Sequence, residues 1–335
     1  MMEVTQLNQA SDLPGQWERL AGSYFQRREF LAHCEAWNPC GQRYYLAWKN
    51  GQLAAGAVLY SLRLSLLTFA RLNLPIAMQI VGIPCSVSCS GLIGPRTETR
   101  ALLQNLQARE RGFLLALNLP SENQVPRGIA AARTLPTLTL EHSFSSWDEY
   151  LSTIRADYRR RIKNIVARSK QLQFRQQTCA EFSREHHGLY LQVLAKSDAK
   201  LEQLGADFFR NLPGDFQMIT AERDRRLAGW AITLNAPEGF YFFLGGVDQT
   251  ENLAHAVYLR LLIEIVKQGI ELGAQRIDLG QTAEIPKMRL GGECHPLYLG
   301  ATHSNPIFRP LLKSASGILG YRRRVPAHHV FGATS

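Results

Sequence analysis

The sequence predicts an α/β protein built from two similar halves, and three observations support this prediction. A chain of 335 residues is longer than one typical domain and fits two. The segment LAAGAVLY at residues 53–60 resembles the segment LAGWAITL at residues 227–234, which begins 174 residues later. In both halves a strand pattern is followed by the patterns of a helix and a further strand, an order typical of α/β folds.

The two similar segments are predicted to be the second strands of two β-hairpins. In the first half, residues 44–48 are expected to form the first strand and Asn50-Gly51 the turn. In the second half, residues 217–221 are expected to form the first strand, with the turn at 224–225. The shared order of elements indicates an internal duplication.

A helix and a strand follow each hairpin. The expected ranges are 100–110 and 113–117 in the first half, and 255–272 and 275–279 in the second. Asn252 is expected to cap the N-terminus of the longer helix, and Gly273 is its expected stop. The apolar residues of this helix recur at helical spacing: Val257, Leu261, Leu262, Ile265, Val266 and Ile270.

A glycine-flanked loop, residues 281–291, follows the last of these strands. It carries four polar or charged candidates for a functional site: Gln281, Glu284, Lys287 and Arg289. Loops at strand ends are where binding and catalytic groups usually lie in α/β folds. The sequence therefore predicts the functional site at this loop.

The connector between the halves is predicted at residues 119–140, which contain Pro120, Pro126 and Pro136. The second half then opens with a capping-box pattern, Ser146 followed by Glu149. Residues 153–171 are expected to form a basic amphipathic helix with an apolar face.

The net charge of +10 is concentrated in two segments. Residues 155–175 hold eight basic residues and one acidic residue, and residues 309–324 hold five basic residues and no acidic one. Basic patches of this kind attract phosphates of nucleic acid, of a nucleotide-bearing cofactor or of an anionic lipid. A solvated helix face is the alternative interpretation of the first segment.

Composition excludes several classes of protein. The chain is 45% hydrophobic and 20% charged, as expected for a globular protein, and no apolar run reaches membrane-spanning length. The N-terminus lacks the features of a signal peptide, so a cytoplasmic location is expected. The six cysteines lack zinc-site spacing and are expected to be free thiols, so no metal is predicted.

The ordered motifs of the second half resemble the Fem-type branch of the GNAT acyltransferase superfamily, which includes peptidoglycan bridge-building aminoacyltransferases. The resemblance extends over residues 147–331 and is weaker over residues 1–140. It rests on the segments DYRRRIKN (157–164), VLAKSDAK (193–200), LAGW (227–230), GGVD (245–248), IDLG (277–280) and KMRLG (287–291).

The resemblance implies two tandem GNAT-like halves, residues 1–140 and 141–335, each a mixed twisted sheet flanked by helices. The active site is expected mainly in the second half. The implied activity is direct transfer of an acyl group to a primary amine, the acceptor being a small molecule. Fem-type members take the acyl group from aminoacyl-tRNA, and other GNAT members take it from acyl-CoA. No tightly bound cofactor is implied.

One departure from the superfamily bears on the donor. The acyl-CoA signature R/Q-x-x-G-x-G/A is absent before the long helix, where residues 249–255 read QTENLAH without a glycine. Such glycines let backbone N–H groups hold a pyrophosphate at a helix N-terminus. A tRNA or carrier-protein donor is favoured by comparison, while acyl-CoA stays open.

Roles for individual residues follow from the resemblance and from the chemistry of amide formation. Lys287 is expected to stabilise the oxyanion, with Arg289 sharing that role or binding a phosphate or carboxylate. Glu284 and Asp248 are candidate bases or amine-orienting carboxylates. The expected substrate-binding residues are Gln281, Thr282, Lys196, Ser197, Asp198 and Tyr321, and the expected donor-phosphate ligands are Arg159, Arg160, Arg161, Lys163, Arg322 and Arg323.

Two other functions stay open at this point. The first is a non-catalytic protein that binds RNA or an anionic surface and retains the GNAT fold. The second is a hydrolase that uses the Cys294-His295 pair, although no orienting acid is evident beside it.

Overall fold

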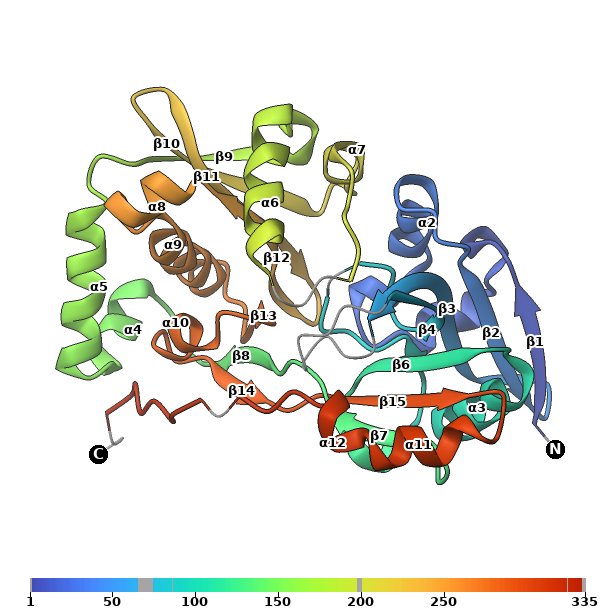
Figure 1. The fold of residues 1–335 in the computed structure, drawn as a ribbon. Coiled ribbons are helices and arrows are strands. Elements are labelled where there is room, and N and C mark those ends of the chain that lie inside the picture. The colour runs from blue at the N-terminus through green and yellow to red at the C-terminus, as the bar shows by residue number, and fades with distance from the viewer. Residues whose placement is uncertain (1, 66–74, 86, 198–200, 324, 333–335) are drawn as a thin grey trace. The chain divides into compact units, whose positions relative to one another are not determined.

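A computed structural model describes residues 2–65, 75–85, 87–197, 201–323 and 325–332 (Figure 1). The chain forms two compact units, which are not continuous in sequence. Unit 1 comprises Met1–Pro136, Asp198–Leu204 and Pro296–Arg323, and unit 2 comprises Thr137–Ser197, Gly205–His295 and Arg324–Ser335.

Unit 1 contains a mixed sheet in the order β1-β2-β3-β4-β6-β15-β7, with β5 paired to β3. Its strands are β1 (Glu3–Leu7), β2 (Arg43–Lys49), β3 (Gln52–Ser65), β4 (Pro75–Val81), β5 (Leu92–Ile93), β6 (Phe113–Leu119), β7 (Ala130–Arg133) and β15 (Tyr298–His303). Its helices are α1 (Gly15–Leu20), α2 (Arg28–Trp37), α3 (Arg96–Arg109), α11 (Phe308–Ser314) and α12 (Ser316–Leu319).

Unit 2 contains a second mixed sheet in the order β9-β10-β11-β12-β13-β8-β14. Its strands are β8 (Thr137–Glu141), β9 (Gln173–Thr178), β10 (Phe216–Arg223), β11 (Arg226–Ala236), β12 (Gly239–Val247), β13 (Arg276–Gly280) and β14 (Glu293–His295). Its helices are α4 (Trp147–Thr153), α5 (Ala156–Arg168), α6 (Arg184–Lys196), α7 (Ala206–Arg210), α8 (Gln249–His255), α9 (Val257–Glu271) and α10 (Glu284–Met288).

The two predicted hairpins are present, and they share one register. Trp48 pairs with Leu53 in the first hairpin, and Glu222 pairs with Leu227, 174 residues later, in the second. Each hairpin has a register shift at the same place, between Ala47 and Trp48 and between Ala221 and Glu222. A bulge is an extra residue that bends a strand, so its repetition at the same offset supports the internal duplication.

The rest of the two sheets follows the same plan. In each, an antiparallel neighbour of the hairpin, β4 or β12, pairs in parallel with the strand after the main helix, β6 or β13. The next strand is antiparallel in both sheets, but it comes from the other half of the sequence. β15 lies beside β6, and β8 lies beside β13. The two halves therefore exchange strands to complete their sheets.

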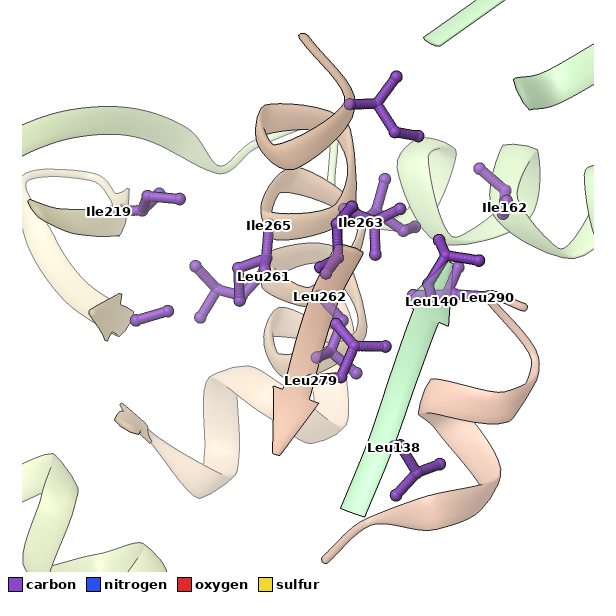
Figure 2. Close-up of a cluster of buried hydrophobic side chains, with 14 of the residues drawn as sticks. Leu138, Leu140, Ile162, Ile219, Leu261, Leu262, Ile263, Ile265, Leu279 and Leu290 are labelled. Carbon is purple, nitrogen blue, oxygen red and sulfur yellow. The ribbon is translucent and has the colours of Figure 1, made fainter. Parts of the chain in front are cut away.

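The core of unit 2 forms around α9, which packs against β11, β12 and β13. The six apolar residues that predicted this helix are all buried, so its apolar face is confirmed. Figure 2 shows Leu261, Leu262 and Ile265 of α9 together with Leu279 of β13 and Leu138 of β8. Burial of side chains of this size stabilises a fold by about 1.5 to 3 kcal/mol each.

Three helix boundaries differ from the sequence prediction. The long helix begins at Val257, since Ala256 adopts a left-handed conformation, and the predicted N-cap Asn252 lies within α8. Asn252 still accepts a hydrogen bond from the Tyr258 backbone N–H across this break. The predicted loop at 281–291 contains the short helix α10. The basic helix, predicted at 153–171, is α5 and begins only at Ala156, since Ile154 and Arg155 separate it from α4, which Ser146 caps.

Within the described residues, the helices lack the combination of length and apolar character required to cross a membrane.

The two hairpin turns allow a direct test of backbone strain. Asn50-Gly51 and Asp224-Arg225 all have positive φ, the geometry of a type I′ turn, which favours glycine at its second position. Because Arg225 has a Cβ atom and φ of 64°, Arg225→Gly is expected to raise the free energy of unfolding by about 0.5 to 1 kcal/mol. Gly51→Arg, the reciprocal change, is expected to lower it by a similar amount in urea denaturation. A loss of stability in Arg225→Gly would contradict this account.

Candidate functional site

The candidate site lies where two central strands of unit 2, β12 and β13, stop pairing with each other. β12 and β13 pair in parallel only through Phe240 with Ile277 and Tyr241 with Asp278. Beyond these pairs, β12 continues to Val247 alongside β11. Among the described residues no further strand pairing joins β12 to β13, so the two strands separate beyond Tyr241 and Asp278.

Lys287 of α10 lies near the end of this pairing. Its Nζ atom lies 5.6 Å from the ring centroid of Phe242, which is on β12, and donates a 2.6 Å hydrogen bond to the Gln281 carbonyl oxygen. Only 2% of Lys287 is exposed, an unusual degree of burial for a lysine. Two acidic residues, Asp278 and Glu284, are also buried and interact electrostatically with it.

The backbone before α10 explains how this lysine is positioned. Gly280, Thr282 and Ala283 all have positive φ, with values of 71°, 61° and 48°. Non-glycine residues in this region cost on the order of 1 to 3 kcal/mol each, and such strain is concentrated at functional sites. The tight turn reverses the chain after β13, so that α10 directs Lys287 back toward the strand ends.

Burial shifts the pKa values of the charged groups toward their neutral forms. Desolvation lowers the pKa of Lys287 to about 7, although Asp278 and Glu284 oppose this shift. Desolvation likewise raises the pKa of Asp278, against hydrogen bonds from the Gly280 N–H and the Thr137 hydroxyl. Near neutral pH, Lys287 is therefore poised between ammonium and amine, a state common at catalytic sites.

A basic cavity of about 650 Å³ lies beside α10 and is formed wholly by residues of unit 2. Arg289, two residues after Lys287, lines it together with the start of α9 at Ala256 and Leu259. The remaining lining residues are Asp157, Tyr158, Arg160, Arg161, Asn164, Ile165 and Arg168 of α5, and His328. Four arginines face one aspartate here, an arrangement suited to a phosphate-bearing ligand.

Several predicted site residues occupy this region in different ways. Glu284 begins α10 and is 2% exposed, while Gln281 contributes its carbonyl oxygen to Lys287. Arg160 and Arg161 line the cavity, and Arg160 forms a 2.8 Å ion pair with Asp157. Arg159 lies off the cavity and donates to the Leu151 carbonyl oxygen, and Lys163 is exposed outside the cavity lining.

Other predicted residues have visible structural roles. Asp248 is the N-cap of α8, and its Oδ1 atom accepts hydrogen bonds from the Thr250 and Glu251 N–H groups. Lys196 ends α6 and donates to the side chain of Gln249, and Ser197 is the C-cap of that helix. Asp198 lies outside the described residues.

Three of the predicted residues belong to unit 1. Tyr321 is half-buried, and its N–H donates to the Arg133 carbonyl oxygen. Arg322 and Arg323 are exposed, and Arg322 donates to the Gly317 carbonyl oxygen. Their expected role toward the donor stays a prediction.

Sequence reasoning did not single out four residues of this region. The negative charge of Asp278 raises the pKa of Lys287. Asn164, Arg168 and His328 line the cavity. The positions 157, 161, 164 and 168 share one helix face, which is a signal the sequence contained. His328 comes from the C-terminal segment, and its Nδ1 lies 3.2 Å from the Tyr158 hydroxyl. Desolvation, together with Arg289 and Arg161, lowers the pKa of His328.

The Cys294-His295 pair is a poor nucleophile in this structure. Burial and the nearby Glu284 raise the pKa of the Cys294 thiol. A raised pKa disfavours the thiolate, which is the reactive form. The structure therefore gives no support to the thiol hydrolase alternative.

Comparison with known proteins agrees with this architecture. Residues 152–287 match the family model described as an acetyltransferase (GNAT) domain. No curated protein matches the sequence. A tandem GNAT protein from the clavulanic acid biosynthesis pathway is similar in structure, with 13% identity, a TM-score of 0.52 and coverage of 91% of this chain and 99% of that chain.

Two further solved structures are similar. A conserved protein of unknown function from Bacteroides thetaiotaomicron VPI-5482 has 10% identity and a TM-score of 0.50, covering 90% of this chain and 99% of that chain. FemX has 9% identity and a TM-score of 0.49, covering 87% of this chain and 95% of that chain.

Residues 152–287 are thus similar to the acetyltransferase (GNAT) domain family, and this match supports an acyltransferase. The fold of the tandem GNAT protein supports the two GNAT-like halves predicted from the repeat. The predicted resemblance to the superfamily and the predicted α/β fold class are thereby confirmed.

The burial of Lys287 leads to a prediction about stability and pH. Its pKa is about 7 in the folded protein and 10.5 without perturbation, so the unfolded state binds more protons between these values. The contribution of Lys287 to the free energy of unfolding therefore rises as the pH increases from about 7 toward 10.5. The cost of burying the charge is fully present below pH 7.

Lys287→Met removes this titration. The variant is expected to be more stable than the wild type at about pH 6, and its advantage should shrink by at most about 1.4 kcal/mol per pH unit above pH 7. Urea denaturation at several pH values measures the difference. Lys267→Met is the matched control because Lys267 is a partly exposed lysine on α9. A pH-independent difference for Lys287→Met would refute the lowered pKa.

Proposed function

We propose that the protein is an N-acyltransferase that forms an amide by direct transfer of an acyl or aminoacyl group from a phosphate-bearing donor to a primary amine. The observation that carries the proposal is the arrangement on α10. This helix carries the buried Lys287, whose Nζ atom lies 5.6 Å from the Phe242 ring of β12, and is followed directly by Arg289 in the arginine-lined cavity. The residues proposed for acyl transfer and for phosphate binding are thus adjacent in the sequence.

In the proposed reaction, the lone pair of the acceptor amine attacks the carbonyl carbon of the donor. The resulting oxyanion collapses, the bond to the donor oxygen or sulfur breaks, and the amine loses a proton. We propose that the Lys287 ammonium stabilises this oxyanion, because a positive charge in a site shielded from water stabilises a developing anion strongly. Asp278 and Glu284 support this role because both raise the pKa of Lys287 against desolvation.

The acceptor must be neutral before it can attack, so its proton passes to a base or to water. Of the two predicted carboxylate bases, Asp248 already accepts two backbone hydrogen bonds as a helix cap. Glu284 is the better candidate, since it lies on the same helix as Lys287 and interacts electrostatically with it. Gln281 and Thr282 belong to the turn before α10 and are proposed to orient the acceptor.

The donor is proposed to place its phosphates in the arginine-lined cavity. Arg161, Arg168 and Arg289 converge there from α5 and α10. The cations exposed along α5 exceed what one pyrophosphate requires, so aminoacyl-tRNA is the favoured donor and acyl-CoA or an acyl-carrier thioester is the alternative. In each case the donor is a substrate and not a tightly bound cofactor.

The role of Lys287 predicts a specific kinetic change. Lys287→Met should lower kcat/KM by at least about tenfold, with little change in the KM for the donor. Lys287→Arg should restore only part of the rate, because its guanidinium is larger and planar. In the wild type, activity should fall as the pH rises through about 7, since Lys287 loses its proton there.

The pH profile distinguishes this role from a purely structural one. The falling limb should be absent from the residual activity of Lys287→Met. If the limb persists in the variant, it belongs to another group. Full activity in Lys287→Met removes Lys287 from the mechanism.

The donor site predicts a salt-dependent affinity. A tRNA donor should bind with a steep dependence on salt, since each neutralised phosphate contributes roughly 0.7 to 0.9 to the log–log slope. The double variant Arg161→Ala/Arg168→Ala should weaken binding and flatten the slope. Lys163→Ala is the comparison variant and should have a smaller effect, because Lys163 lies on the same helix outside the cavity.

The donors are distinguished by parallel titrations with tRNA and with CoA. A shallow slope with CoA, together with no binding of tRNA at low salt, would assign an acyl-CoA donor. Binding of tRNA without transfer from any charged donor would instead support the non-catalytic alternative. Equal effects of the double variant and of Lys163→Ala would exclude the cavity as the donor site.

A further inference from the structure

Exposed apolar side chains gather on one short segment of unit 1. Ile307, Phe308 and Leu311 are 70%, 42% and 60% exposed. Elsewhere in the described residues, large exposed apolar side chains occur singly along the sequence: Trp37, Val166, Val193, Leu253 and Leu272. Single exposed residues are normal on protein surfaces, whereas a cluster indicates an interaction site.

The geometry of α11 turns this cluster outward. Leu312 is buried in the core of unit 1, and α11 packs against β15 and β7. Ile307 has helical dihedral angles and lies four residues before Leu311, so both side chains project from the same face. Phe308 lies on one flank, where its ring contacts Phe113 and His303. The helix is thus anchored on one side and apolar on the other.

Positive charge accompanies this apolar face. Lys313 is exposed in the last turn of α11. Arg309 is only partly exposed, and its guanidinium donates hydrogen bonds to the His303 and Ser304 carbonyl oxygens. The sequence from Cys294 to the C-terminus contains no aspartate or glutamate, whereas five arginines and lysines lie between residues 309 and 324. The surface around the exposed apolar residues therefore carries no acidic residue of this segment.

We propose that α11 docks the protein on the surface of an anionic phospholipid bilayer. Ile307 and Leu311 enter the boundary between headgroups and acyl chains, and Lys313 contacts the lipid phosphates. Apolar side chains beside cations on a helix that lies in the interface are the features by which proteins bind anionic membranes. This inference rests on α11 and is independent of the donor and of the acyl-transfer site.

A protein partner fits these observations less well. Stable protein interfaces bury about 800 Å² on each partner around a large apolar core. The exposed apolar face of α11 is confined to Ile307, Leu311 and the flanking Phe308. A bilayer needs no complementary shape, and it matches both the apolar side chains and the cations of this segment.

Vesicle sedimentation with the full-length protein tests the proposal. We expect binding to vesicles of phosphatidylcholine mixed with phosphatidylglycerol, weaker binding at high salt, and little binding to phosphatidylcholine alone. The double variant Ile307→Ser/Leu311→Ser should lower the partition coefficient at least about tenfold, because it removes two inserting side chains. Lys313→Gln should lower it by about fivefold.

Two control variants separate this surface from other features. Leu272→Ser removes an exposed leucine of unit 2, which is 52% exposed, and should leave vesicle binding unchanged. Arg161→Ala/Arg168→Ala should retain most of the binding, since those arginines line the donor cavity. Because Ile307 and Leu311 are exposed, their double variant should keep the wild-type melting temperature.

Three results would overturn the proposal. The first is no binding to anionic vesicles at low salt. The second is equal loss of binding in Leu272→Ser and in Ile307→Ser/Leu311→Ser. The third is a concentration-dependent dimer in analytical ultracentrifugation that this double variant abolishes while vesicle binding stays unchanged, which would assign the face to a second copy of the chain.

Discussion

Both sheets depend on a strand that comes from the other half of the sequence. β13 would end the sheet of unit 2 with an open edge if β8, which precedes α4 by only a few residues, did not pair with it. β6 has the same requirement in unit 1, and β15 meets it. An open central strand leaves a row of backbone donors and acceptors unpaired, so each half needs the other to complete its hydrogen bonding.

This exchange also supports the candidate site. β8 contributes Thr137, whose hydroxyl donates a hydrogen bond to Asp278, and it contributes Leu138 and Leu140 to the core around α9. Asp278 in turn supports the charged form of Lys287. A strand from the end of the first half thus helps to set the electrostatics of a site whose catalytic candidates come from the second half.

The site combines features that oppose stability with features that suit chemistry. Burial of an ammonium group and a left-handed turn at Thr282-Ala283 both cost free energy. The buried apolar face of α9 supplies the compensating stability. The benefit is a lysine whose charge is poised near neutral pH and whose position is set by a rigid turn, beside a cavity that is rich in arginine. Such preorganisation is what electrostatic catalysis requires.

The sequence by itself determined the elements whose signals are local. The repeated hairpins followed from alternating patterns and turn residues, and α9 followed from its apolar spacing. Lys287 was singled out mainly by the resemblance to the Fem-type branch, together with its place in a loop after a strand. The tertiary structure alone decided which strands complete each sheet, because such pairing joins residues far apart in the sequence. It also decided the burial of Lys287 beside Asp278 and the convergence of Arg168, Arg289 and His328 on one cavity. These depend on left-handed residues at Ala256 and Ala283, where the backbone adopts a conformation that alanine does not favour and that no local pattern predicts.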